Sequence, residues 1–364
     1  MTLQRLDGLY TLKDVIMVFR LRTILTVTLL LLSGVAMAKS IRAQSAVIWS
    51  DPGDVASRDL RFGPGAPNLA PVAPFTFIQE DKSGESPKFE VRDARGVKWA
   101  VKLGEEAQAE TVATRLVWSV GYFAEEAYYY DRVRIRRLPK LSRGMEHVGA
   151  RGTVRGARFE PRRNHIKRGD TWDWDKNPFA DTKELNGLKI LMVLLNNYDA
   201  RKENNRVLQL KNSQTGDVET RYAVTDLGAT LGKAGGLGGK RSKNNLEDFL
   251  STKFVKGVEK DGSVEFDYDT RPTKLGMLSV VYPPYYRGEV KKEKSMRGIP
   301  VEHAVWIGSL LSQLTDEQLR TAFHAARYDR ATTAGYVSAL RSRITQLTRL
   351  SGAVAESASP TPSP

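Results

Sequence analysis

The chain has 364 residues, a formal net charge of +14 and no cysteine, which excludes disulfides, thiolate metal sites and cysteine nucleophiles. Its hydrophobic fraction of 41% and charged fraction of 27% are those of an ordinary globular protein, long enough for one large two-lobed domain or two smaller ones. The basic residues are spread along the chain and mixed with acidic ones. The charge therefore indicates a generally basic protein rather than one built to bind nucleic acid.

The N-terminal region has the features of an export signal. Two arginines precede an apolar run from Ile24 to Leu32, and Ala36-Met37-Ala38 supplies the small residues of a cleavage site. We therefore predict a signal peptide over residues 1–38, with Met17 as an alternative start, and a secreted or periplasmic protein. If the segment is not cleaved, it would anchor the chain to a membrane, although the run is shorter than the roughly 20 residues of a spanning helix.

A stretch rich in Pro and Gly separates this signal from the first strand patterns. Residues 39–74 are predicted to form a linker or an extended strap outside the core. Three strands are then predicted. Phe75–Gln79 is apolar with β-branched residues, Phe89–Asp93 alternates apolar and polar residues, and Val97–Leu103 follows a tight turn. We expect these strands to form the first sheet of the fold.

The loop between the first two strands contains Gly84, Ser86 and Lys88. A Gly/Ser loop can direct backbone N–H groups at phosphate oxygens, and Lys88 or Lys82 would add positive charge. A plain hairpin loop is the alternative interpretation of the same residues.

Lys102 lies near the end of the third predicted strand, and a helical pattern follows over Glu105–Val120. Glu110 flanks the apolar stripe of this helix and is placed to point back at Lys102. A Lys–Glu pair would hold the ammonium group in position for a phosphate. Glu106, one turn earlier, is the rival partner, and a third interpretation leaves Glu110 on the surface.

The next region combines aromatic and basic residues. Gly121–Tyr130 breaks the helical pattern, and Tyr128–Arg136 predicts a further strand. Residues 137–181 are basic and are predicted to be irregular. Within them, Trp172 and Trp174 are either a ligand platform or anchors that hold a long loop on the core.

A buried helix is predicted over Thr182–Asn196, with Asp181 or Thr182 as its N-cap. It ends at a polar loop with an Asp-x4-Asn spacing. The polar residues of this loop are Asp199, Arg201, Lys202, Asn204 and, one position further on, Asn205.

Two strands, Arg206–Leu210 and Arg221–Thr225, form a predicted hairpin after this loop. The second strand delivers Asp226 in a Thr-Asp-Leu-Gly turn. Oxygen ligands from Asn and Asp suit magnesium or manganese. Asn204 and Asp226 are therefore the candidate metal ligands, with Asn205 as the alternative to Asn204.

The C-terminal third is predicted to be mainly helical. Residues 228–245 are rich in Gly and predict a mobile basic loop. Helices are then predicted over Leu246–Phe254, Val301–Leu314, Gln318–Arg327 and Ala331–Leu350, with a disordered tail over residues 351–364.

The motifs Lys102, Glu110, Asp199, Asn204 and Asp226 occur in the order of the protein-kinase-like superfamily, which the chain resembles from about residue 75 to residue 350. It looks most similar to the atypical branches, namely the phosphatidylinositol-kinase-like, HipA-like, secretory-pathway and spore-coat kinases. It also resembles a group of exported bacterial proteins that share the pattern from Ser86-Pro87-Lys88-Phe89 through Lys102 and Gly104 to Glu110.

The resemblance implies an α+β fold with two lobes. A small β-rich N-lobe would span residues 75–136 and a larger, mainly helical C-lobe residues 137–350. The hinge between the lobes would lie near Gly121–Tyr130, with apolar side chains against an adenine ring.

The resemblance also implies roles for the motif residues. Asp199 would orient an acceptor hydroxyl and accept its proton, with Arg201 or Lys202 near the transferred phosphoryl charge. Asn204 and Asp226 would bind the metal ion. Phosphates would contact Lys102, held by Glu110, and the loop residues Gly84, Ser86 and Lys88.

The predicted function is an exported, ATP-dependent and divalent-metal-dependent phosphotransferase acting on a protein, lipid or small-molecule hydroxyl. The alternative is a catalytically inactive kinase-like protein of the cell envelope that binds a nucleotide or another ligand. A third class is an envelope protein that binds an anionic polymer through residues 151–168 and 240–243.

Overall fold

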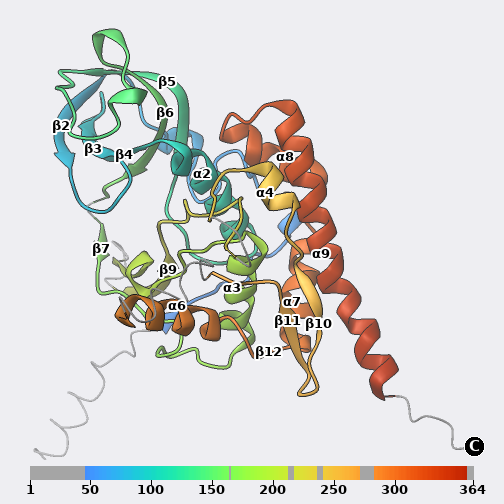
Figure 1. Ribbon diagram of the computed structural model, residues 1–364. Coiled ribbons are helices and arrows are strands. Elements are labelled where there is room, and N and C mark those ends of the chain that lie inside the picture. The colour runs from blue at the N-terminus through green and yellow to red at the C-terminus, as the bar shows by residue number, and fades with distance from the viewer. Residues whose placement is uncertain (1–45, 164, 212–216, 236–240, 271–282, 359–364) are drawn as a thin grey trace, which may run out of the picture. The chain divides into compact units, whose positions relative to one another are not determined.

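A closed five-stranded β-barrel is the first large element of the fold (Figure 1). The computed structural model describes residues 46–163, 165–211, 217–235, 241–270 and 283–358, and the predicted signal peptide lies outside them. The barrel order is β2-β3-β4-β6-β5. Its strands are β2 (Phe75–Asp81), β3 (Lys88–Arg92), β4 (Lys98–Leu103), β5 (Tyr128–Arg136) and β6 (Thr153–Pro161).

Alternate residues of these strands fill the barrel. Phe89 and Val91 of β3, Trp99 and Val101 of β4, and Phe159 of β6 are completely buried in one hydrophobic cluster. The two-residue period follows from the pleat of a strand, in which successive side chains point to opposite faces. The other face of β4 is thereby free to present Lys102 outside the barrel core. The predicted strands in β2 to β5 are confirmed.

Strand β6 corrects the prediction that residues 137–181 are irregular. It pairs antiparallel with both β4 and β5, so the barrel continues beyond residue 136, where the predicted first lobe ends. The cause of the error is that Arg158 and Glu160 are charged yet buried. In the same region, Trp172 and Trp174 are buried in the helical core, which matches the anchor interpretation.

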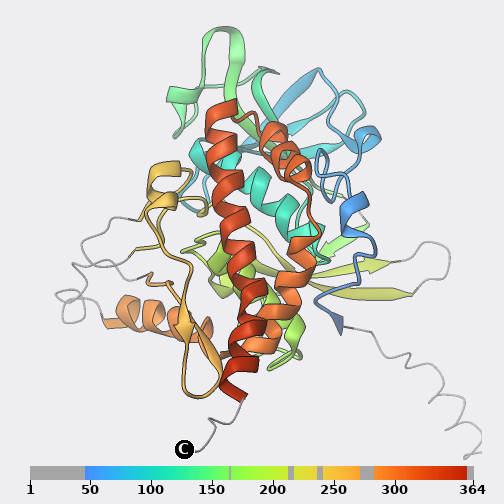
Figure 2. The ribbon, with the colours of Figure 1, turned by 90° about the vertical axis from the view of Figure 1, so that its right-hand side faces the viewer.

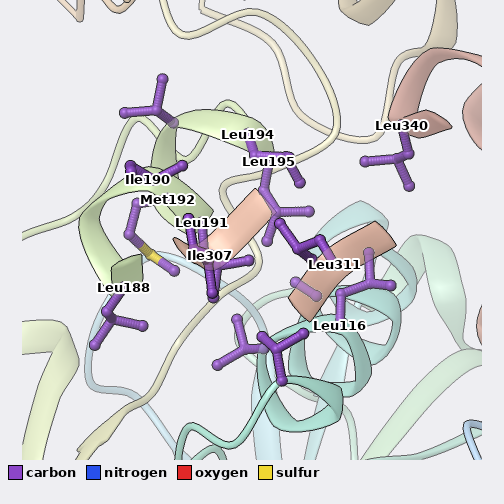
Figure 3. Packing of buried hydrophobic residues seen from close by; sticks show 14 of the residues in the cluster. Leu116, Leu188, Ile190, Leu191, Met192, Leu194, Leu195, Ile307, Leu311 and Leu340 are labelled. Carbon is purple, nitrogen blue, oxygen red and sulfur yellow. The ribbon is translucent and has the colours of Figure 1, made fainter. Parts of the chain in front are cut away.

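A second hydrophobic cluster is built by helices (Figure 3). It includes Leu188 and Leu191 of α3, Ile307 and Leu311 of α7, and Leu116 of α2, and α3 packs against α7. Helix α9 packs along α7 and α8 (Figure 2). The helices are α2 (Glu105–Ser119), α3 (Lys183–Leu194), α4 (Leu246–Leu250), α6 (Pro283–Ser295), α7 (Val301–Ser312), α8 (Asp316–Ala325) and α9 (Arg330–Ala358).

Local signals explain where several helices begin. The Thr182 hydroxyl accepts a hydrogen bond from the Leu185 N–H and caps α3. Thr315 and Gln318 form a reciprocal capping box at α8. Such caps satisfy backbone N–H groups that have no partner inside the helix.

Two further sheets complete the fold. One has the order β1-β9-β8-β7 and the other the order β10-β11-β12. The strands are β1 (Ala46–Val47), β7 (Ile166–Arg168), β8 (Asn205–Lys211), β9 (Val218–Val224), β10 (Val255–Val258), β11 (Ser263–Phe266) and β12 (Ile299–Pro300). Short 3₁₀ turns lie at Val55–Ser57, Pro67–Leu69, Met145–His147, Ala150–Gly152 and Lys202–Asn204. The described chain is thus a mixed α+β fold, as predicted.

The C-terminal third differs from the prediction in three places. Helix α4 ends at Leu250, before the predicted end at Phe254, and the chain continues into β10 and β11. Helix α6 was not predicted. Helix α9 continues to Ala358 through residues predicted to be a disordered tail, in a segment where alanine favours the helix. Residues 359–364 and part of the predicted Gly-rich loop, 236–240, lie outside the described residues.

The segment before the barrel is a strap that takes part in the core. Ile48, Val55 and Leu60 are buried in the helical cluster, and β1 pairs in parallel with β9. The predicted position outside the core is therefore wrong for these three side chains, although the extended-strap interpretation describes the path. Within the described ranges, no helix combines the length and apolar character that a membrane span requires.

The burial of the strap can be tested with two matched leucines. Leu60 is 1% exposed and Leu69, nine residues on, is 37% exposed. Leu60→Ala should lower the free energy of unfolding by about 2–5 kcal/mol because it leaves a cavity, whereas Leu69→Ala should change it by less than about 0.5 kcal/mol. Urea denaturation of both variants measures the difference. Equal effects would show that the strap does not stabilise the core.

Candidate functional site

The Lys102 ammonium group lies among three carboxylates. Its Nζ is 2.9 Å from Glu110 Oε2, 3.4 Å from Glu106 Oε2 and 2.5 Å from Asp226 Oδ1. Glu106 and Glu110 lie one turn apart on α2, and Asp226 follows β9. Three elements that are distant in sequence therefore meet at one positive charge.

Burial and charge act in opposite directions on Lys102, which is only 7% exposed. Burial alone would lower the pKa of Lys102, but the carboxylates of Glu110 and Asp226 outweigh it and raise the pKa above its ordinary value. The side chain therefore stays cationic, which is the state that can bind phosphate oxygens.

Glu110 is fully buried and bridges two cations. One of its oxygens contacts Lys102, and the other lies 3.2 Å from Arg158 Nη1. The interpretation of Glu110 as a surface residue is therefore wrong, and the predicted pair with Lys102 is present. The rival Glu106 also contacts Lys102, so the two alternatives occur together.

Glu106 ties three segments together. It accepts a hydrogen bond from Lys243 Nζ at 2.6 Å and another from the Ser86 hydroxyl, in addition to its contact with Lys102. Burial opposes its ionisation, but Lys102 and the bonds from Lys243 and Ser86 prevail and lower the pKa of Glu106 to about 2. The helix thus holds the loop between β2 and β3 through a carboxylate that is ionised at neutral pH.

The Asp-Leu-Gly turn brings Asp226 to the site. Asp226 has a left-handed backbone with φ of 52°, a conformation that Asp tolerates better than most residues. A Cβ added at Gly228 would lie 2.6 Å from the Glu106 Cβ, so only glycine lets the turn pass against α2. The Asp226 side chain itself is 49% exposed, which leaves part of the carboxylate open to solvent.

The Asp199 loop lies next to this turn. Thr225 donates from its backbone N–H and its hydroxyl to the Asn204 carbonyl, at 2.8 and 2.9 Å. Asn204 Nδ2 in turn donates to the carboxylate and the carbonyl oxygen of Asp199, both at 2.8 Å. Because Nδ2 is used in this way, Oδ1 of Asn204 is the side-chain atom that could bind a metal ion.

Asp199 is suited to accept a proton. Burial raises its pKa, although Arg201, whose Nε lies 2.5 Å from Oδ1, and the bond from Asn204 oppose the shift. A carboxylate with a raised pKa is a stronger base than a solvated one. Arg201 is therefore close to Asp199, while Lys202 is exposed and has no ion-pair partner among the described residues.

The remaining predicted residues are less closely joined to Lys102. Gly84 is exposed and has a left-handed φ of 65°, and Arg143 donates to its carbonyl. Lys88 pairs with Lys102 in the strand register but directs its ammonium to Asp81, at 3.5 Å. Of the three loop residues, only Ser86 contacts a carboxylate of the Lys102 cluster.

Arg158 is the site residue whose role was not predicted. It lies directly across from Lys102 in the β4–β6 pairing and is 4% exposed. Its second contact is Glu160, at 3.0 Å. The register of two antiparallel strands would have revealed it, but β6 had to be recognised first.

The site offers few side chains to a resident metal ion. Among the described residues, no group of three or more His, Asp or Glu side chains could hold one. Asn204 and Asp226 supply only two side chains. Such a pair fits magnesium or manganese that completes its coordination with phosphate oxygens and water, since Mg²⁺ commonly binds through one or two carboxylates plus substrate phosphates.

Comparison with known proteins adds a structural likeness. No family model and no curated protein matches the chain. Among solved structures, the chain is similar to the Helicobacter pylori proinflammatory kinase CtkA, with 12% sequence identity and a TM-score of 0.43, covering 79% of this chain and 100% of that chain.

The depressed pKa of Glu106 predicts a pH-dependent contribution to stability. Its pKa is lowered from 4.5 to about 2, so the stabilisation is complete above about pH 5 and is lost as the pH falls toward 2. The free energy of unfolding of the native protein should exceed that of Glu106→Gln by about 2–3 kcal/mol at neutral pH. The difference should be smaller at about pH 3. Denaturant unfolding across this pH range measures the difference. Glu105→Gln, which changes an exposed neighbouring glutamate, is the control. A gap that does not change with pH would contradict the prediction.

The close approach of the turn predicts a strict need for glycine at position 228. Gly228→Ala should destabilise the protein by about 1–3 kcal/mol because the new methyl group overlaps Glu106. Gly257→Ala is the matched control, since nothing lies within 4 Å of its added Cβ, and it should change stability by less than about 1 kcal/mol. Thermal unfolding compares the two variants, and a tolerated Gly228→Ala would show that the turn can move away from α2.

Proposed function

We propose that this chain is an exported kinase-like phosphotransferase that uses ATP and magnesium or manganese to phosphorylate a hydroxyl group. One observation carries the proposal: Lys102, Glu110 and Asp226 converge, although they come from a strand, a helix and a turn far apart in the sequence. A buried lysine positioned by a glutamate, beside an aspartate that can hold a metal, is the arrangement that binds and neutralises transferable phosphates. Export and a two-lobed arrangement are parts of the same proposal.

The residues present fit a metal–nucleotide complex. Lys102 would bind phosphate oxygens, and Asp226 and Asn204 would hold the metal ion. The nucleotide and its metal supply the phosphoryl group and the neutralisation of its charge. Ser86, fixed by its bond to Glu106, keeps the loop between β2 and β3 beside this group of residues.

Asp199 would serve the acceptor. Its carboxylate is held by Asn204 and Arg201, and burial strengthens it as a base. It would orient the acceptor hydroxyl and take up its proton as the new oxygen–phosphorus bond forms. Arg201 would compensate charge near the transferred group. The acceptor would be a protein, lipid or small-molecule hydroxyl.

A second candidate function is a catalytically inactive kinase-like protein that binds a nucleotide or another ligand. The observation that favours it is the direct contact between Lys102 and Asp226, at 2.5 Å. This ion pair neutralises the carboxylate without a metal ion. A protein that keeps this pair in solution could hold a ligand nearby without transferring a phosphoryl group.

Substitution of Asp226 distinguishes these functions. We expect Asp226→Asn to lower ATP-dependent phosphotransfer at least about 100-fold, because a charged metal ligand is lost, and to remove the magnesium dependence of ATP binding. The control is Asp131→Asn, which alters an exposed aspartate of β5 and should have no effect. Isothermal titration of ATP with and without Mg²⁺, followed by a radiolabelled ATP consumption assay, provides both readouts.

The possible results separate the candidates. ATP binding without turnover in the native protein would favour the inactive alternative. Absence of ATP binding with Mg²⁺ or Mn²⁺ present, or full activity in Asp226→Asn, would overturn the proposed phosphotransferase.

A further inference from the structure

A cavity of about 600 Å³ lies between the α2–β5 connection, the end of β6 and strand β8. Neither Lys102 nor Asp199 nor Asp226 is among its lining residues. Its volume falls in the range of small-molecule sites, which is about 300–1,000 Å³. The cavity is therefore large enough for a ligand and separate from the residues assigned to phosphotransfer.

One wall of this cavity is apolar and partly aromatic. It is formed by Trp118 at the end of α2, Phe123 in the following connection, and Leu208 and Leu210 of β8. Flat rings bind well to such walls, since aromatic side chains offer a large rigid contact area. The wall thus favours a ligand with a flat apolar body.

Most of the charge around the cavity is already balanced. Arg163 binds Glu126 with two nitrogens, at 2.7 and 2.6 Å. Arg168 contacts both Glu125 and Glu160, and Arg162 also contacts Glu160. These pairs leave little unsatisfied charge for a ligand to meet.

Two further charged residues of the lining have other partners. Arg221 binds Glu219 and lies over the Phe123 ring, with its guanidinium carbon 4.8 Å from the ring centroid. Asp51 is exposed and accepts a hydrogen bond from the Gly53 N–H. The lining as a whole carries one more arginine than carboxylates.

Arg58 is the exception to this balance. Its guanidinium carbon is 3.8 Å from the centroid of the Trp118 ring, and Nη1 donates to the Pro52 carbonyl at 3.2 Å. The Arg58 side chain is half-buried, and no carboxylate pairs with it among the described residues. An arginine that lines a cavity without a carboxylate partner leaves its positive charge available to a bound anion.

We propose that this cavity is a binding site for a small amphipathic anion. The flat apolar body of the ligand would lie against Leu208 and against the parts of the Trp118 and Phe123 rings that Arg58 and Arg221 do not cover. Its carboxylate, sulfonate or phosphate would bind Arg58.

The site uses neither Lys102, Asp199 nor Asp226. Its Phe123 lies in the segment predicted to contact an adenine ring, so competition with ATP is one of the tests below.

Two fluorescent probes that differ in one charged group test this proposal. 8-Anilinonaphthalene-1-sulfonate has an aromatic body and one sulfonate, and N-phenyl-1-naphthylamine has nearly the same body without it. We expect the folded protein to bind the sulfonate probe at one site. Arg58→Met should weaken this binding about tenfold, the loss of one charge-assisted contact of about 1.4 kcal/mol, and should leave the affinity for the uncharged probe unchanged.

Two further variants locate the site. Arg132→Met removes an exposed arginine of β5 outside the cavity and should not change either affinity. Leu208→Asp places a carboxylate on the apolar wall and should weaken both probes. Circular dichroism and thermal unfolding of each variant establish that it is folded before the titration is interpreted.

Several results would overturn the proposal. These are absence of sulfonate-probe binding to the native protein, equal affinity in Arg58→Met, or unchanged binding of both probes to a folded Leu208→Asp. Displacement of the probe by ATP with Mg²⁺ would show that the cavity belongs to the nucleotide site rather than to a separate one. A protein that binds the probe but no nucleotide would leave this site standing while the proposed phosphotransferase fails.

Discussion

The buried Lys102 ammonium group is the constraint on which the site depends. A cation that is removed from water must recover its hydration energy from nearby carboxylates. Glu106 and Glu110 can provide them only if α2 begins directly after β4, which the left-handed turn at Gly104 allows, with φ of 88°. Three features of the fold surround this one charge. They are the strand-to-helix connection at Gly104, the glycine at position 228 and the path of β6 beside β4.

The charges around Lys102 form a continuous chain that is buried from Lys102 to Glu160. Asp226, Lys102, Glu110, Arg158 and Glu160 alternate in sign, with neighbours 2.5 to 3.2 Å apart. From Glu160 the chain continues through Arg168 to Glu125. Each interior member contacts charges of opposite sign on both sides, which is how so many charges remain in a low-dielectric interior. The barrel, α2 and the Asp226 turn are thereby held by the same set of contacts.

The strongest sequence signals predicted most elements that carry this site. They did not predict β6, whose buried residues include the charged Arg158 and Glu160. Apolar periodicity located α2, α3 and β5, and the order of the polar motifs identified Lys102, Glu110 and Asp226 as a group that the structure brings together. Strand β6 and the role of Arg158 were not predicted, because a periodicity of apolar residues does not detect a buried charge whose partner is distant in sequence. The strap was misjudged for a related reason: isolated apolar residues such as Val55 and Leu60 among Pro and Gly form no period, yet they are buried.

The contact between Lys102 and Asp226 determines how the two candidate functions differ. Lys102 has two other carboxylate partners, so it remains compensated if Asp226 turns to a metal ion. The Asp226 side chain is half exposed, so a cation from the solvent side can reach its carboxylate. Lys102 and a metal ion would therefore compete for the single carboxylate of Asp226, and the free-energy difference between the two bound states decides which cation it binds. An active enzyme and an inactive binding protein can share every other contact of this site.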